Sequence, residues 1–281
     1  MNIGKYNIQA VETGNFYLDG GAMFGVIPKP IWEKSNPSDE RNRVKLSARC
    51  LLLSNEKRKI LIDTGCGNKW DDKAKSIYSF DYQFNTLEKS LLKSGISPDE
   101  ITDVILTHLH FDHAGGSTKF ENDRLVPSFP NAIYYVQKSN FEWAKTPTEK
   151  DRASFIKENF QPLYDYGILK FIDGNEQFDD EIELKKLDGH TFGQQLIKIS
   201  DSSQTLFYCG DLFPYTAHIH IPALPGFDLQ PLVTLQEKKK ILQQAIEEEW
   251  KLFFEHDPDT ITTKVQKTEK GFRAKEQMNS V

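Results

Sequence analysis

The sequence THLHFDHAGG, residues 107–116, is the strongest structural signal in this chain of 281 residues. It contains His108, His110 and His113, three of the seven histidines of the chain, with Asp112 among them. The first two histidines and the aspartate keep the two-residue period that turns side chains to one face of an extended chain, directly after a short apolar run typical of a buried strand. His113 breaks that period, and the alanine and glycines after it permit a turn and a close backbone approach. A polar loop with solvated histidines is the alternative, but four ligand-type side chains behind a buried strand favour a metal site.

The composition of the whole chain limits the classes of protein it can represent. Its length suits one large domain or two small ones with a full core. The formal net charge of −6 argues against a nucleic-acid-binding protein, without excluding a local basic patch. We see no secretory signal and no run approaching the ~20 apolar residues of a membrane span, so we predict a cytoplasmic protein without a membrane partner. The three cysteines form no CxxC pair and are expected in the core, which fits a reducing compartment.

Apolar periodicity predicts strands in the centre of the chain with helices between and after them. Strands are expected within 49–63 and at 104–106, 132–137, 168–173, 181–187, 195–200 and 205–210. Helices are expected at 84–95, 149–163 and 234–254, the last beginning with a capping box formed by Thr234 and Glu237. Strand runs interleaved with helices predict layered α/β or α+β packing.

The stretch 107–116 matches the HxHxDH signature of the metallo-β-lactamase superfamily, and the chain resembles members of that superfamily. The resemblance implies a four-layer αββα sandwich with ions at the sheet edge, and it covers roughly residues 45–260. It also implies three further ligands, each present in family order: His190 in LDGHTFGQQ, Asp211 in FYCGDLFP and His256 in FFEHDP. We therefore expect a single domain, 1–281, of this fold.

With this ligand set the resemblance implies two divalent ions. The first would be held by His108, His110 and His190, the second by Asp112, His113 and His256, and Asp211 would bridge the two. Histidine and carboxylate ligands without thiolate favour Zn²⁺, with Mn²⁺, Fe²⁺ and Co²⁺ as alternatives. Such a pair lowers the pKa of a bridging water and supplies hydroxide for hydrolysis, with Asp112 and Asp211 as catalytic residues and Asp211 as proton carrier. Asp63, in IDTGCG, is expected to orient a ligand histidine, or else to be a simple turn residue.

The segment LDGGAMFGVIPKPIW, residues 18–32, is the main guide to the substrate. It resembles the N-terminal lid, here 15–45, of bacterial lactonases that open N-acyl-homoserine lactones in quorum quenching. The resemblance implies substrate contacts by Met23, Phe24, Phe111, Tyr215 and His218. Any one of the lid residues could instead simply pack the loop onto the core.

One position departs from the lactonase pattern. Many homoserine lactonases carry a tyrosine three residues after the bridging aspartate, where this chain has Pro214, and Tyr215 follows one residue later. The sequence therefore leaves open whether a tyrosine contacts the lactone carbonyl. An apolar lid can also serve as a dimer contact, so a homodimer is a further expectation.

The predicted function is therefore a metal-dependent hydrolase for a small-molecule ester or lactone, foremost an N-acyl-homoserine lactonase. The alternative is an organophosphate or aryl-ester hydrolase of the methyl-parathion-hydrolase-like branch, which has the same ligand set. A metal-dependent nuclease is disfavoured by the acidic balance, and a non-catalytic metal-binding protein finds no support in the full ligand set.

Overall fold

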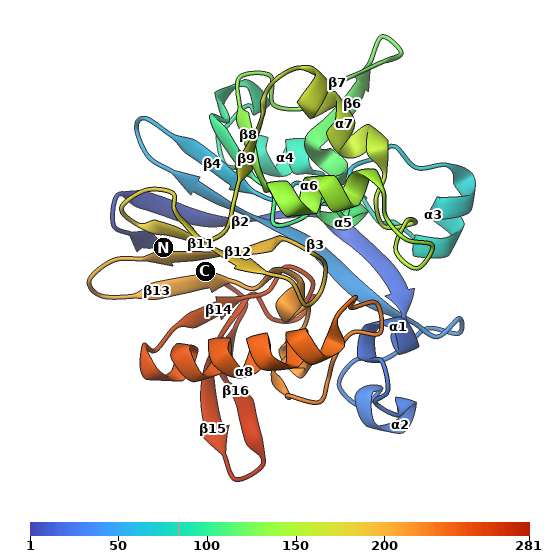
Figure 1. Ribbon diagram of the computed structural model, residues 1–281, viewed down its shortest axis with the longest axis vertical. Helices are drawn as coiled ribbons and strands as arrows, with labels where there is room; N and C mark the ends of the chain where they lie inside the picture. Colours follow the sequence, from blue (N-terminus) through green and yellow to red (C-terminus); the bar gives the residue numbers. More distant parts are fainter. Residues whose placement is uncertain (84) are drawn as a thin grey trace.

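The computed structural model describes residues 1–83 and 85–281 and contains two seven-stranded sheets that face each other (Figure 1). The first sheet has the order β1 (Asn2–Ile3), β2 (Tyr6–Asp19), β3 (Arg43–Ser54), β4 (Lys59–Ile62), β5 (Asp103–Ile105), β8 (Ile133–Gln137) and β9 (Leu169–Ile172). The second has the order β10 (Glu176–Gln177), β11 (Ile182–Leu187), β12 (Gln194–Ser200), β13 (Thr205–Tyr208), β14 (Lys251–Phe253), β15 (Thr262–Thr268) and β16 (Gly271–Met278). A small hairpin, β6 (Thr118–Glu121) and β7 (Arg124–Pro127), stands apart.

Helices cover the outer face of each sheet. Figure 1 shows α4 (Leu87–Lys93), α6 (Lys138–Lys145) and α7 (Lys157–Asp165) on one side of the stacked sheets and α8 (Pro231–Glu247) on the other. The alternation along β3 explains the layers, because Leu51 and Leu53 point into the core between the sheets while Leu52 points into the core under the helices. The structure therefore confirms the αββα architecture expected from the sequence.

Strand direction places the functional loops at one edge. Strands β4, β5, β8 and β9 run parallel to one another, and so do β13 and β14 in the second sheet. The stretch 107–116 follows the carboxyl end of β5 and Asp63 follows that of β4. Loops at the carboxyl ends of parallel strands meet at one edge of a sheet, which is where ligand sites form in α/β proteins.

One helix prediction needs correction at both ends. The helix expected at 234–254 begins at Pro231, a favourable first residue because its fixed backbone suits a first turn, and it ends at Glu247 so that β14 can pair with β13. The expected capping box is absent, since the carboxylate of Glu237 instead accepts hydrogen bonds from the backbone N–H groups of Asp188 and Gly189. That contact ties α8 to the loop that carries His190.

The other two predicted helices are shorter than expected. The helix expected at 149–163 starts only at Lys157, after a run of turns, and the one expected at 84–95 is α4, with residue 84 outside the described part of the chain. Between β2 and β3 the chain leaves the sheet and forms α1 (Gly20–Phe24) and α2 (Lys29–Trp32), within the segment expected as a lid. Among the described residues, no helix is both long and apolar enough to cross a bilayer.

Candidate metal centre

Four predicted ligand groups converge beyond the end of β5. His108 Nε2 lies 2.9 Å from His110 Nδ1, and His190 Nε2 lies 3.2 Å and 3.1 Å from these two nitrogens. Asp211 completes the group, with its Oδ2 3.0 Å from His190 Nε2. All four side chains are at least nine-tenths buried. The structure thus brings together three histidines and one carboxylate from three separate loops.

A second group lies on the other side of Asp211. His113 Nε2 and His256 Nε2 are 3.2 Å apart, and Asp112 lies 3.9 Å from the first and 3.8 Å from the second through its two oxygens. Asp211 reaches this group as well, with Oδ2 3.4 Å from His113 Nε2 and Oδ1 3.1 Å from His256 Nε2. One carboxylate therefore faces both groups, as a bridging ligand would.

The spacing of these atoms suits metal ions. Ligand atoms placed tetrahedrally at 2.0–2.1 Å from a Zn²⁺ ion are separated from one another by roughly 3.3 Å, close to the distances found here. Neutral histidine nitrogens that point at each other with their lone pairs repel unless a cation or a proton lies between them. Asp211 Oδ1 also has no hydrogen-bond partner among the described residues. The two groups could therefore each hold one divalent ion.

Acceptors on the outer side of the histidines set the ring orientations. His190 Nδ1 donates to Asp228 Oδ1 at 3.0 Å, and His256 Nδ1 donates to the backbone oxygen of Ser47 at 2.9 Å. His113 Nδ1 donates to Asp63 Oδ2 at 3.1 Å, as expected for an orienting residue. Each bond places the proton on Nδ1 and leaves the Nε2 lone pair facing the centre, which is the form a metal needs.

Asp63 is itself held firmly. It accepts hydrogen bonds from the backbone N–H of Thr107 at 2.7 Å and from the Thr107 hydroxyl at 2.8 Å. Glu255 lies beside it, with Oε2 3.0 Å from His113 Nδ1, and burial raises the pKa of Glu255 to about 8. Sequence reasoning identified neither Glu255 nor Asp228. Their signals were weak: Glu255 directly precedes a ligand histidine, and Asp228 lies in a loop far along the chain from its partner.

The electrostatics of the site favour positive charge at its centre. Burial lowers the pKa of His190 and of His256, but the carboxylate of Asp211 outweighs it and raises both values to about 9. Burial raises the pKa of Asp211, and the surrounding histidines more than reverse this and hold it well below its usual range. Protons or cations are therefore drawn to the space between these groups.

The glycine pair at 115–116 is needed for close packing rather than for an unusual backbone angle. A side-chain carbon on Gly115 would lie 2.2 Å from the backbone oxygen of Cys66, and one on Gly116 would lie 2.2 Å from that of Thr64. The backbone N–H of Thr64 in turn donates to the His113 oxygen at 2.7 Å. The turn after β4 and the ligand loop therefore fix each other.

The residues expected to contact substrate divide into two sets. Met23, Phe24, Tyr215 and His218 are almost fully buried inside the lid. The Phe24 ring stacks on the rings of Tyr215 and His218 with centroids 5.9 Å and 5.3 Å away. His218 Nε2 donates to the Met23 oxygen at 2.9 Å, while its Nδ1 accepts from the Tyr215 backbone N–H at 3.2 Å. These four residues fasten the lid to the segment after Asp211.

Phe111 is placed differently. It lies between the predicted ligands His110 and Asp112 and is buried against an aromatic group of Trp70, Tyr78 and Phe80, which are only partly buried. Its ring centroid is 5.2 Å from that of Trp70. This aromatic group therefore adjoins the second ligand group.

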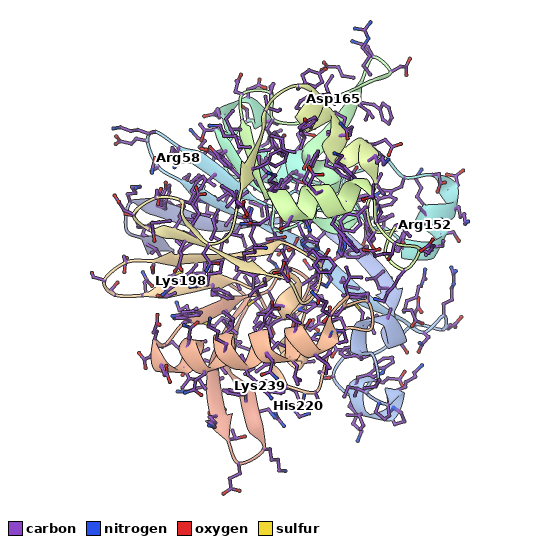
Figure 2. All side chains as sticks on the ribbon, in the orientation of Figure 1. Arg58, Arg152, Asp165, Lys198, His220 and Lys239 are labelled. Atoms are coloured by element: carbon purple, nitrogen blue, oxygen red, sulfur yellow. The ribbon has the colours of Figure 1, made fainter. Side chains whose placement is uncertain are left out.

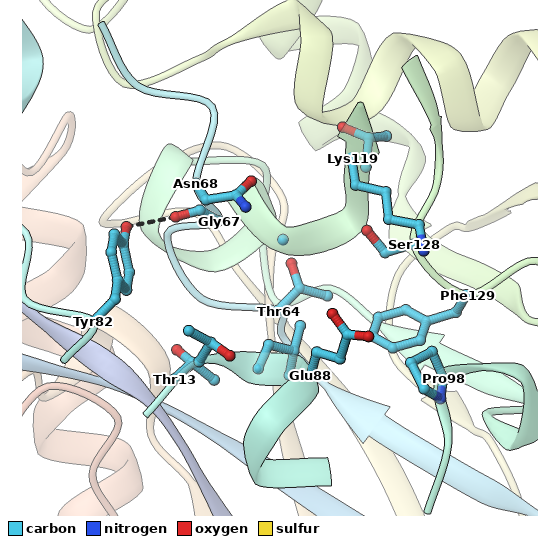
Figure 3. Close-up of a pocket in the computed structure, with 14 residues that line it drawn as sticks. Thr13, Thr64, Gly67, Asn68, Tyr82, Glu88, Pro98, Lys119, Ser128 and Phe129 are labelled. Atoms are coloured by element: carbon cyan, nitrogen blue, oxygen red, sulfur yellow. Dashed lines mark hydrogen bonds between the residues drawn. The ribbon is translucent and has the colours of Figure 1, made fainter. Parts of the chain in front are cut away.

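Two large cavities lie away from the ligand groups. One, of about 430 Å³, lies behind the glycine pair and is lined by residues that include Thr64, Tyr82 and Lys119 (Figure 3). The other, of about 610 Å³, lies between the lid and β16 and is lined by residues that include Trp32 and His220. His220, labelled in Figure 2, accepts a hydrogen bond from Arg273 and is not part of the ligand groups.

The two stacked sheets, the outer helices and the buried histidine–aspartate cluster are the features of a metallohydrolase fold. The family model described as the metallo-beta-lactamase superfamily matches residues 44–256, and the chain belongs to this superfamily. This confirms the family expected from the signature.

Individual relatives agree with this assignment. An N-acyl homoserine lactonase from Bacillus cereus is 26% identical over 227 residues, which cover 77% of this chain and 83% of that protein. The solved structure of a probable metal-dependent hydrolase from Staphylococcus aureus is 27% identical with a TM-score of 0.88, covering 99% of this chain and 100% of its own. AidC, described as a dizinc quorum-quenching lactonase, is 21% identical with a TM-score of 0.81, covering 99% of this chain and 97% of its own, and at that identity supports the fold alone.

Proposed function

We propose that this chain is a hydrolase with two divalent metal ions that opens the lactone ring of N-acyl-homoserine lactones. The observation that carries the proposal is the pair of buried ligand groups that share Asp211. The named lactonases among its relatives, which align over most of their length, supply the substrate class. Zn²⁺ is the proposed ion, because the donors are imidazole nitrogens and carboxylate oxygens without thiolate.

Each ligand residue has a proposed role. His108, His110 and His190 hold the first ion, Asp112, His113 and His256 the second, and Asp211 both. When bound, the two ions supply an activated water at neutral pH and polarise the acyl oxygen. The Asp211 carboxylate, facing both groups, is the base placed to take up a proton from the reacting water and pass it to the leaving oxygen.

The residues around the ligand groups orient the histidines and provide an apolar surface for the substrate. The outer acceptors Asp63, Asp228 and the Ser47 oxygen keep the imidazoles of His113, His190 and His256 in the orientation that binding requires. Phe111 and the aromatic residues beside it offer an apolar surface for the acyl part of a substrate. Met23 and Phe24 of the lid, together with Tyr215 and His218, support this surface by packing in the same cluster as Phe111.

The test is ring opening by purified protein loaded with Zn²⁺, followed as acid release. N-hexanoyl and N-dodecanoyl homoserine lactone are the substrates, paraoxon and p-nitrophenyl acetate the alternatives, and Asp211→Asn the inactive reference. We expect turnover of at least one lactone to exceed that of the reference by about 10³-fold or more. Turnover of paraoxon without either lactone would instead favour the organophosphate-hydrolase alternative, and no lactone turnover would refute the proposal.

A further inference from the structure

The segment directly after Asp211 offers no tyrosine hydroxyl that is free to face the ligand groups. Pro214 has no side-chain donor, and the neighbouring Tyr215 is fully buried. The Tyr215 hydroxyl donates to the backbone oxygen of Lys45 at 2.6 Å. Its hydrogen is therefore committed to the lid and not directed to the ligand groups.

Tyr78 offers a hydroxyl from a different part of the fold. It is the last residue of α3 (Asp72–Tyr78), and its ring centroid lies 4.9 Å from that of Phe111, which stands between two ligand residues. The side chain is only partly buried. Within the described part of the chain, its hydroxyl has no hydrogen-bond partner. A tyrosine that packs its ring in an apolar group and leaves its hydroxyl unpaired has a donor available for a ligand.

The end of α3 is held in place by Arg43, the first residue of β3, and by Asp39 in the loop before it. Arg43 Nη1 donates to the backbone oxygens of Ile77 at 2.9 Å and Ser76 at 3.2 Å. Asp39 holds that guanidinium through bonds of 2.8 Å. These contacts satisfy carbonyl groups at the helix end. The position of Tyr78 is therefore fixed by the strand that also carries the lid.

Ring contacts place Tyr78 near the second ligand group, because Phe111, which packs on the Tyr78 ring, also packs on Phe16, and the Phe16 ring centroid lies 5.7 Å from that of His256. Burial raises the pKa of Tyr78, and the negative charge of Asp112 raises it further. The phenol therefore stays protonated and able to donate at neutral pH.

We infer that Tyr78 donates a hydrogen bond to the acyl oxygen of a substrate at the ligand groups, in the place that Tyr215 cannot fill. This inference rests on the proposed function for the lactone, but the same donor would meet a phosphoryl oxygen in the same position. Tyr78 is then a catalytic residue contributed by α3, outside the segments that carry the ion ligands. Removing one neutral hydrogen bond costs about 0.5–1.5 kcal/mol, or roughly 2- to 12-fold in binding or rate.

The test compares Tyr78→Phe with wild type and with Tyr166→Phe, a matched control whose side chain is 57% exposed on the surface. Metal content is measured in each protein, then kcat and KM with N-hexanoyl homoserine lactone, and calorimetric binding of the ring-opened product. We expect unchanged metal content, about a 10-fold lower kcat/KM and weaker product binding in Tyr78→Phe alone. Equal kinetics and product binding in Tyr78→Phe and wild type would overturn the inference. Tyr215→Phe is measured in the same way, and a loss confined to that variant would overturn the inference as well.

The experiments give a different result if the proposed lactonase function is wrong. Wild-type protein that opens no lactone but hydrolyses paraoxon would refute the lactonase, and the ratio between Tyr78→Phe and wild type on paraoxon would then decide the role of Tyr78. A lower metal content in Tyr78→Phe would assign the residue to the structure of the ligand groups and overturn its assignment as a substrate donor.

Discussion

Asp228 provides a sharp test of the geometry around the first ion. Its Oδ1 accepts the Nδ1 proton of His190 at 3.0 Å, its side chain is fully buried, and its Oδ2 has no partner among the described residues. Replacing it with alanine leaves a buried N–H without an acceptor, which costs about 1–3 kcal/mol. Loss of such an outer acceptor weakens metal binding by about 10- to 100-fold, or about 1.4–2.7 kcal/mol in binding free energy. This range agrees with the cost of the unpaired N–H group.

The assay is competition for Zn²⁺ between the protein and a chelator of known affinity. We expect affinity for one of the two ions to fall in the order wild type, Asp228→Asn, Asp228→Ala, because asparagine keeps an acceptor oxygen but not the charge. Asp180→Asn is the control, since the Asp180 side chain is 97% exposed. Wild-type affinity for both ions in Asp228→Ala, with the circular dichroism spectrum unchanged, would refute the reasoning.

Two further predictions concern the lid and the ions. His218→Leu removes the hydrogen bond to the Met23 oxygen, so we expect a loss of about 1–3 kcal/mol in unfolding free energy. We also expect faster proteolysis within residues 20–42, with metal content unchanged. Equal protease resistance in the variant and wild type would contradict the role of His218 in holding the lid in place. Chelation should lower the unfolding temperature, because two ions at 100 times their Kd contribute about 5 kcal/mol together, or roughly 10–20 °C, measured by calorimetry. An unfolding temperature that does not respond to chelation would count against buried ions.

The ligand groups could be predicted because their signals are local. The stretch 107–116 carries four ligand types in ten residues, and His190, Asp211 and His256 each occur in a short motif with a recognisable context. The structure places all of them within reach of one another. Contacts between distant segments carry no such signal. The pairing of Asp228 with His190 spans 38 residues and depends on how the loop before α8 folds back.

The fold was predicted less completely than the ligand groups. Strand β2 alternates buried and exposed side chains over 14 residues, a strand signal that was available in the sequence. The C-terminal hairpin of β15 and β16 is mostly polar in sequence, so apolar periodicity could not reveal it. Strand β14 was absorbed into a predicted helix because three residues carry too little pattern, and pairing with β13 decides their conformation.

The resemblance to lactonases did not predict how the side chains of the lid segment pack. Met23 and Phe24 occur in the expected segment, but their side chains pack against Tyr215 and His218 instead of facing outward. The aromatic residues that stay partly exposed beside Phe111 come from the segment around α3, which gave no clear signal in the sequence. Side-chain direction in an irregular loop depends on tertiary packing, and sequence pattern does not encode it.

The most direct test of the account is the number and place of the bound ions. A crystal of Zn²⁺-loaded protein, measured with anomalous scattering at the zinc edge, should show two ions per chain about 3.5–4 Å apart, both in contact with Asp211. His108, His110 and His190 should surround one ion, and Asp112, His113 and His256 the other. A single ion per chain, or two ions of which only one contacts Asp211, would contradict the account.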